Sequence, residues 1–161
     1  IDVLGVGSLI NLKDYEQFVR VIALLKRDKP EINAEIIGDG VERKNLIALI
    51  SQLGLEQNVK LVGHLSRKMV YEKMSQARVF LHTSIYETQG YVFNEALLAG
   101  IPIVSKAVGI ASEQTYWELV ENDDDLAEAI RYFMEKPTEI PAKANVGMKK
   151  TVEQYLMMYE S

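Results

Sequence analysis

Asp2-Val-Leu-Gly-Val-Gly7 opens the chain as an apolar run that ends in glycine. Apolar side chains then recur at helical spacing, at Tyr15, Phe18, Val19, Ile22 and Leu25. Pro30 ends this segment, and a second apolar run, Ile32-Asn-Ala-Glu-Ile-Ile37, follows at once. Two apolar runs joined by a helix through short connections are typical of the βαβ unit of a parallel sheet.

The same alternation continues along the rest of the chain. We expect further strands over residues 59–62, 79–81 and 101–104. We expect further helices over residues 42–53, 66–75, 92–98, 126–134 and 152–159, with a loop over 136–147. The predicted fold is an α/β doubly wound parallel sheet, a three-layer Rossmann-like domain that spans residues 1–161 as a single unit.

The composition excludes several classes of protein. With 161 residues, 48% hydrophobic and 25% charged, the chain has the makeup of one ordinary globular domain. It has no cysteine, which excludes disulfides, thiolate zinc sites and cysteine nucleophiles. Two histidines leave little for an imidazole-rich metal site, so we expect no metal. A net charge of −5 without a basic block argues against nucleic acid as a partner.

The beginning of the chain predicts a fragment. Ile1 stands where a methionine would begin a complete protein, and the strand-like run starts immediately after it. Apolar runs such as residues 21–25 are far shorter than the ~20 residues that span a bilayer. The absence of cysteine favours a cytoplasmic location.

In parallel sheets of this kind, ligands bind beyond the carboxyl ends of the strands. We therefore expect the site in the segments just after the strands, residues 7–13, 38–40, 63–65, 82–90 and 105–113. The candidates from the first three are Gly7, Ser8, Lys13, Gly38, Gly40, His64 and Leu65. Neither Gly5-Val-Gly7 nor Gly38-Asp-Gly40 completes the Gly-x-Gly-x-x-Gly fingerprint, so dinucleotide binding is poorly supported. The glycines either form tight turns or let a ligand approach the backbone, and Lys13 either meets a phosphate or is solvated.

The strongest local signal is Glu87-Thr-Gln-Gly-Tyr-Val-Phe-Asn-Glu95. On one helix the two carboxylates would lie ~12 Å apart along the axis, so we place Glu87 in a loop and start the helix near Gly90. The amides of Gly90 to Val92 would then form an anion site, which suits a nucleotide diphosphate sugar whose hydroxyls donate to the carboxylates. The alternative, a loop acid and a solvated helical acid, stays open on spacing alone.

Three other groups of residues have simpler interpretations. Asp123-Asp-Asp125 precedes a helix, so we assign it to capping and helix-dipole stabilisation rather than to a metal site. His64 and His82 could orient a substrate, although a lone histidine after a strand is more often structural. We expect Tyr116 and Trp117 to be packing residues.

Taken in order, these segments resemble a known family. They are Val6-Gly-Ser-Leu9 with Lys13, Ile37-Gly-Asp-Gly40, Val59-Lys-Leu-Val-Gly63, Ala77-Arg-Val-Phe-Leu81, Ser84-Ile-Tyr-Glu-Thr-Gln-Gly90, Asn94-Glu-Ala-Leu-Leu-Ala-Gly100 and Ile101-Pro-Ile-Val104. The series resembles the C-terminal, donor-binding domain of a GT-B fold glycosyltransferase of family 4, the glycosyl transferases group 1. Its most specific part is the Glu87 to Glu95 element followed by Ala99-Gly-Ile-Pro102.

The resemblance implies a retaining hexosyltransferase whose substrate is a UDP- or GDP-sugar and which needs no metal or other cofactor. It implies that Glu95 holds the ribose hydroxyls, that Glu87 holds the transferred sugar and that Lys13 neutralises the diphosphate. The base would lie near residues 63–65. Sugar and phosphate would meet the backbone amides of Gln89, Gly90, Tyr91 and Val92.

The resemblance also implies partners outside this chain. The acceptor, a glycan or a lipid, would be held by an N-terminal domain that the chain lacks, so the fragment alone would be inactive. Polysaccharide or glycolipid synthesis at the inner face of a membrane, with peripheral association of the full-length protein, is the family-level expectation.

Three departures from the family pattern keep other functions open. Ser8 stands where the family usually has Arg, Gln89 stands where Phe is usual, and the stretch after Gly109 is shortened. The loss of one cation from the diphosphate site motivates an alternative, a degenerate non-catalytic module that binds nucleotide sugars or regulates a partner. A more distant alternative is another doubly wound nucleotide-binding protein, such as a sugar-nucleotide epimerase.

Overall fold

The computed structural model describes residues 1–88 and 90–136. Within these residues, six parallel strands form one sheet in the order β3-β2-β1-β4-β5-β6. The strands are β1 (Val3–Val6), β2 (Ala34–Ile37), β3 (Val59–Gly63), β4 (Val79–His82), β5 (Ile103–Ser105) and β6 (Trp117–Leu119). The helices are η1 (Asn11–Lys13), α1 (Tyr15–Lys26), α2 (Arg43–Gln52), α3 (Arg67–Ser75), α4 (Tyr91–Ala99) and α5 (Asp123–Glu135).

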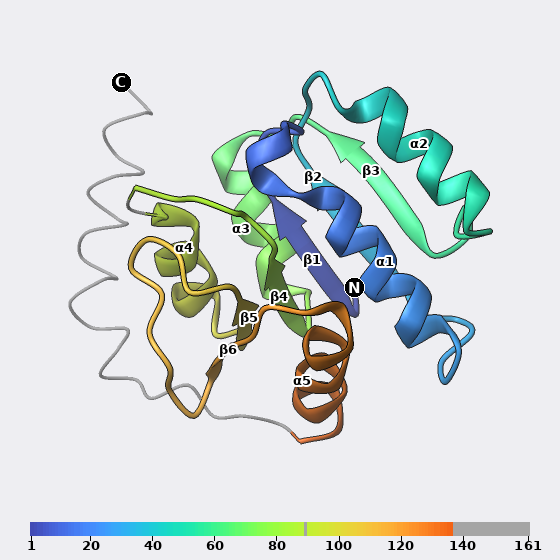
Figure 1. Ribbon diagram of the computed structural model, residues 1–161. Helices are drawn as coiled ribbons and strands as arrows, with labels where there is room; N and C mark the ends of the chain where they lie inside the picture. The colour runs from blue at the N-terminus through green and yellow to red at the C-terminus, as the bar shows by residue number, and fades with distance from the viewer. Residues whose placement is uncertain (89, 137–161) are drawn as a thin grey trace.

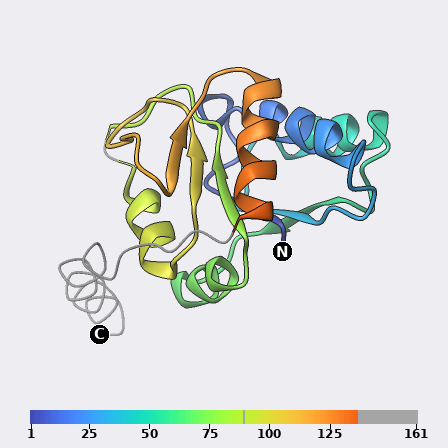
Figure 2. The same ribbon diagram turned by 90° about the horizontal axis from the view of Figure 1, so that it is seen from below.

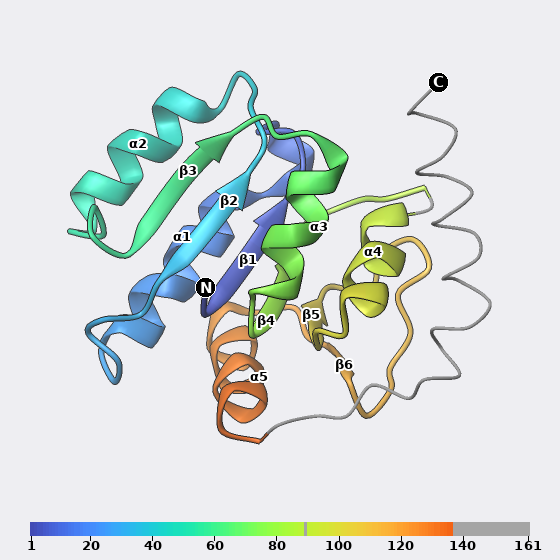
Figure 3. The same cartoon turned by 180° about the vertical axis from the view of Figure 1, so that it is seen from behind.

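The helices cover both faces of the sheet, which confirms the predicted doubly wound fold. Figures 1 and 3 show α1, α2 and α5 over one face and α3 and α4 over the other, and Figure 2 shows the sheet between these two layers. Each layer has its own apolar core, with Phe18 and Ile130 in the first and Phe93 and Met74 in the second. The strand order reverses between β1 and β4, which is the position where such sheets bind ligands.

Most of the helix ends follow the signals in the sequence. Ser66 caps α3 by accepting a hydrogen bond from the Met69 amide, and Gly54 takes a left-handed conformation after α2. The three aspartates Asp123, Asp124 and Asp125 form the first turn of α5 instead of preceding it. The cap itself is Asn122, whose side chain accepts from the Asp125 amide at 2.9 Å.

The prediction missed one strand and shifted others. β6 is a three-residue edge strand, and its Trp117 side chain is buried and donates to the Ser105 hydroxyl at 2.8 Å. Tyr116 and Trp117 are packing residues, as expected. The strand expected over 101–104 begins at Ile103, and the strand expected over 32–37 begins at Ala34.

Two further predictions fall outside the described residues: Gln89, and the loop and helix expected beyond Lys136. Among the residues that are described, no helix has the length and apolar character needed to cross a membrane.

Candidate functional site

A cleft of about 530 Å³ opens at the carboxyl edge of the sheet, where the strand order reverses. The residues that follow β1, β2 and β3 line it, together with residues of α3, the β4–α4 connection and α4. The predicted site residues that line it are Gly7, Ser8, Lys13, Gly38, His64, Leu65, Glu87, Gly90, Tyr91, Val92 and Glu95. The cleft also contains two charged residues that were not named as candidates: Asp39, which lies in the expected segment 38–40, and Arg67, which lies outside every expected segment.

Gly38 lets two strand-end loops pass in direct contact. Its φ is +143°, and a Cβ placed there would lie 1.9 Å from the Gly7 carbonyl oxygen. Gly40 has the same packing role, because a Cβ there would lie 2.3 Å from the Leu9 carbonyl oxygen. Gly40 is not among the residues that line the cleft.

Glu87 is the centre of a compact polar cluster. Its Oε1 accepts hydrogen bonds from Lys13 Nζ, from His82 Nε2 at 2.9 Å and from Ser84 Oγ at 3.0 Å. Within residues 1–88 and 90–136, the side-chain hydrogen bonds of Glu87 all go to this one oxygen. Burial opposes ionisation of the carboxyl, but Lys13 and then Ser84 and His82 outweigh it, so the pKa of Glu87 lies below its ordinary value.

His82 is the last residue of β4, and its side chain is 3% exposed. The ring centroid lies 5.9 Å from that of Phe80 and 4.7 Å from that of Phe93. Burial lowers the pKa of His82 to about 4, although the negative charge of Glu87 acts against this shift. The neutral ring therefore donates from Nε2 to the ionised Glu87. The sequence favoured a structural role for His82, and in the structure its ring donates to the candidate site residue Glu87.

Glu95 lies in the second turn of α4 and faces a different environment. Its Oε1 pairs with Arg67 Nη2 at 3.1 Å across the cleft. Burial raises the pKa of the Glu95 carboxyl, and the positive charge of Arg67 offsets only part of the increase. Arg67 is the first residue of α3, and its link to Glu95 could not be read from the sequence because it joins two different helices.

The N-terminus of α4 faces the same space. Gly90 is the N-cap with φ +69°, and its carbonyl accepts from the Phe93 amide at 3.0 Å. The first amides of any helix lack carbonyl partners within the helix and attract anions. Because Gly90, Tyr91 and Val92 line the cleft, this end of α4 can bind a negatively charged group.

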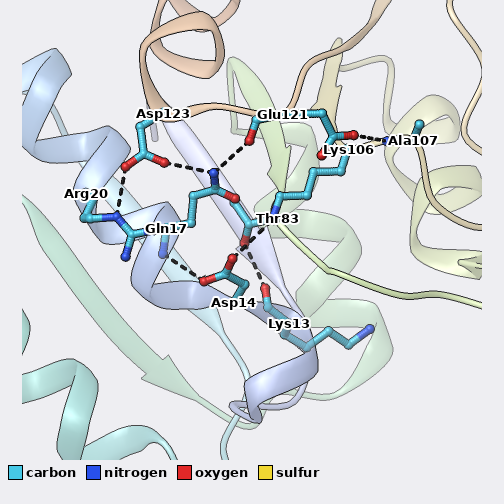
Figure 4. A network of polar contacts seen from close by, with 9 residues as sticks. All are labelled: Lys13, Asp14, Gln17, Arg20, Thr83, Lys106, Ala107, Glu121 and Asp123. Carbon is cyan, nitrogen blue, oxygen red and sulfur yellow. Dashed lines mark hydrogen bonds and ion pairs between the residues drawn. The ribbon is translucent and has the colours of Figure 1, made fainter.

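A network of polar contacts supports the backbone of Lys13 (Figure 4). Thr83, which follows β4, donates to the Lys13 carbonyl at 2.8 Å. Lys106, which follows β5, pairs with Asp14 at 3.1 Å. Gln17 of α1 donates to the Glu121 carbonyl at 2.9 Å and to Asp123 at 2.8 Å. The loops after three strands therefore converge on the junction between η1 and α1.

Comparison with known proteins identifies relatives of the chain. The model of the glycosyl transferases group 1 family matches residues 1–151. An N-acetylgalactosaminyltransferase from Campylobacter jejuni, which acts on a diphospho-undecaprenol-linked sugar by its name, is 30% identical over 128 residues. The match covers 76% of this chain and 34% of that protein, so the chain spans about a third of the relative.

Solved structures share the fold. S. aureus TarM, in a complex that contains UDP, has a TM-score of 0.82 and 21% identity over 99% of this chain and 35% of its own. Anabaena HepE, in complex with UDP and glucose, has a TM-score of 0.77 and 25% identity over 96% of this chain and 48% of its own. The domain is thus of the Rossmann-like type found in GT-B glycosyltransferases, as the sequence resemblance implied. The chain belongs to the glycosyl transferases group 1 family.

Proposed function

We propose that this domain holds the nucleotide diphosphate sugar donor of a retaining hexosyltransferase. The proposal rests on one observation: the Lys13–Glu87 pair, the N-terminus of α4 and Glu95 all line the same cleft. Further support comes from HepE, a 25% identical protein of the same fold that was solved with UDP and glucose. The sugar donor is the substrate, and we propose no cofactor.

Each side chain has a task in this proposal. Glu95 accepts from the ribose hydroxyls, and Glu87 accepts from the transferred sugar through Oε2, because Oε1 is already engaged. Lys13 neutralises the diphosphate from its position beside Glu87. His64 and Leu65 border the space for the base, and Gly7, Ser8 and Gly38 form the wall beside the phosphates.

The chemistry follows from where charge develops. The bond between the anomeric carbon and the β-phosphate oxygen breaks while the acceptor oxygen bonds to that carbon, and the acceptor hydroxyl proton passes to the departing phosphate. Negative charge builds on the phosphate, and the sugar gains oxocarbenium character. Lys13 and the amides of Gly90 to Val92 stabilise the leaving group, with Gln89 assigned to the same set of amides. We do not assign Glu87 as a nucleophile. Since these groups supply the charge neutralisation, we expect nucleotide binding to be insensitive to EDTA.

The acceptor is proposed to bind outside this chain. Because the chain spans about a third of the Campylobacter relative, a further domain of a longer protein would supply the glycan or lipid acceptor. The isolated chain would then bind a donor without transferring its sugar. A cytoplasmic location with peripheral membrane association of the longer protein is part of the same proposal.

Calorimetric titration tests the proposal directly. UDP, GDP, UDP-glucose, UDP-N-acetylglucosamine and GDP-mannose are added to the chain up to millimolar concentration, and at least one should bind. Glu95→Ala should weaken that binding, whereas Glu128→Ala, a change of the same kind at an exposed position on α5, should not. If none of the five ligands binds at millimolar concentration, the proposal is wrong.

A second candidate function rests on Ser8. This exposed residue lines the cleft at the position where the family pattern has Arg, so the diphosphate site has one cation fewer. A binding or regulatory module without transferase activity would tolerate this loss. Transfer by the full-length protein distinguishes the two functions: a higher turnover in Ser8→Arg indicates a weakened enzyme, and inactivity of both forms indicates the module.

A further inference from the structure

The junction between η1 and α1 contains an unusual backbone conformation. Asp14 has φ +45° and ψ +49°, and within residues 1–88 and 90–136 it is the one non-glycine residue with positive φ. Such left-handed geometry crowds the Cβ of an L-residue, although aspartate tolerates it better than most. Asp14 ends η1, with its amide donating to the Asn11 carbonyl at 3.1 Å, and it also caps α1.

Both carboxylate oxygens of Asp14 have partners. Oδ1 accepts from the Gln17 amide at 3.3 Å, which is the helix cap, and Oδ2 accepts from Lys106 Nζ at 3.1 Å. The Lys106 side chain is only 12% exposed, so this ion pair is poorly screened by solvent. The loop that carries Lys106 is itself held, because the Ala107 amide donates to the Glu121 carboxylate at 3.4 Å (Figure 4).

These contacts determine how Lys13 is presented to the cleft. The peptide between Lys13 and Asp14 is fixed on one side by Thr83, which donates to the Lys13 carbonyl. On the other side it is fixed by the left-handed φ of Asp14. If Asp14 relaxed to the right-handed region, this peptide would rotate and the Thr83 hydrogen bond would be lost. The Lys13 side chain would then leave its position beside Glu87.

We propose that Lys106 is a positioning residue that holds Lys13 in place for the donor diphosphate by clamping the left-handed backbone of Asp14. This inference rests on the proposed function, because it needs a diphosphate beside Lys13. It adds a residue from the β5–β6 side of the sheet, outside the cleft lining, to the machinery of the site.

The test compares two ligands that differ only in the diphosphate. UDP and uridine, or GDP and guanosine if the titration panel selects GDP, are titrated into the chain. The ratio of their affinities reports the diphosphate contacts alone. Lys106→Met should reduce this ratio about tenfold while the affinity for the nucleoside is unchanged. Lys106→Arg, which keeps the ion pair, should restore most of the ratio.

Arg20→Met is the matched control. It removes another cation from the same region, the partner of Asp123 at 2.9 Å, without touching Asp14 or Lys106. The nucleotide-to-nucleoside ratio should be unchanged in this variant. If Lys106→Met weakens the nucleoside and the nucleotide equally, its effect is a general loss of structure and the inference is overturned.

A double-mutant cycle separates positioning from long-range charge. Asp14→Asn keeps a side chain that can cap α1 and tolerates the left-handed region, but it removes the ion pair with Lys106. In this background, Lys106→Met should lose most of its effect on the ratio. A full effect would mean that Lys106 attracts the diphosphate directly, which contradicts the inference. If the unsubstituted chain binds nucleotide and nucleoside equally, the proposed function fails and the inference with it.

Discussion

Glu87 and Glu95 lie in the same cleft, but their environments shift their pKa values in opposite directions. Three donors converge on Glu87 Oε1, and Lys13 is among them, so the pKa of this carboxyl is lowered. Glu95 has the side chain of Arg67 at 3.1 Å, and burial prevails, so its pKa is raised. Two glutamates only eight positions apart, one in the β4–α4 connection and one in α4, therefore differ because of the partners that the fold brings to them.

The difference matches the two tasks that we propose. A carboxylate that stays ionised at every physiological pH is suited to the developing positive charge of the transferred sugar. A half-buried carboxylate beside the cation of Arg67 is suited to accept from neutral ribose hydroxyls.

The largest expected effect is on the pH dependence of stability, and it comes from His82. This residue contacts Glu87 and not Glu95. Its pKa is about 4 in the folded chain and 6.5 ordinarily, so between these pH values the unfolded chain binds a proton that the folded chain does not. Stability therefore falls as pH falls from 6.5 to 4, by about 3 kcal/mol in total from this residue. Urea denaturation at several pH values measures this loss.

His82→Gln keeps a donor for Glu87 but cannot titrate. The free energy of unfolding of this variant should depend less steeply on pH over the same window. The lowered pKa of Glu87 stabilises the fold above pH 4.5, and this contribution is lost as pH falls below that value. It therefore does not affect the comparison of the two proteins between pH 4.5 and 6.5. Identical slopes in the two proteins would show that His82 is not the titrating group.

The second prediction removes the cation that distinguishes the two glutamates. Lys13→Met should weaken UDP binding by roughly 2 kcal/mol, about thirtyfold, because a charge-assisted contact is lost. It should also raise the pKa of Glu87, since burial then acts against weaker opposition. Calorimetry measures the first effect and carboxyl NMR the second. Lys44→Met, at an exposed position on α2, is the control and should change neither.

The third prediction separates the ribose from the rest of the donor. Glu95→Gln should weaken UDP binding about tenfold and should abolish the preference for UDP over 2′-deoxy-UDP. Glu87→Gln should leave that preference unchanged, because Glu87 is assigned to the sugar. Titration of both nucleotides into both variants gives the four affinities. If Glu87→Gln loses the preference for UDP over 2′-deoxy-UDP and Glu95→Gln keeps it, Glu87 binds the ribose and the proposed roles of the two glutamates are wrong.

The smallest expected effect concerns Arg67. Its positive charge lowers the pKa of Glu95, so Arg67→Met should raise this pKa further. As pH falls, UDP binding by the variant should then weaken more steeply than binding by the unsubstituted chain, by roughly two- to threefold, because a protonated carboxyl accepts less strongly from the ribose. Parallel pH profiles for the variant and the unsubstituted chain would show that the pair has no influence on Glu95.

Much of the fold follows from local patterns, and the failures have physical causes. Apolar runs that end in glycine predict strands and the edge where ligands bind, which is why Gly7 and Gly38 were placed correctly at the cleft. β6 was missed because three residues, Trp117–Leu119, are too short to show a period. Gly40 was also predicted at the site, but what requires a glycine there is its close approach to the Leu9 backbone.

The partners of the site residues could not be predicted, because each comes from another part of the chain. Glu87 and Lys13 are 74 positions apart, so only the completed sheet brings them together. The same holds for Arg67 with Glu95 and for Lys106 with Asp14, which join separate elements. The left-handed conformation of Asp14 also has no local signature, since aspartate before a helix predicts an ordinary cap.

The reversal of strand order between β1 and β4 has a consequence for assembly. The two strands pair through Val3 with Val79 and Leu4 with Phe80, and this pairing joins two consecutive halves of the chain, each with three strands. Lys13 belongs to the first half, whereas Glu87 and Glu95 belong to the second. Neither half can build the cleft alone. Nucleotide binding would therefore report the docking of the two halves, and a chain divided between α3 and β4 would regain it only when both pieces associate.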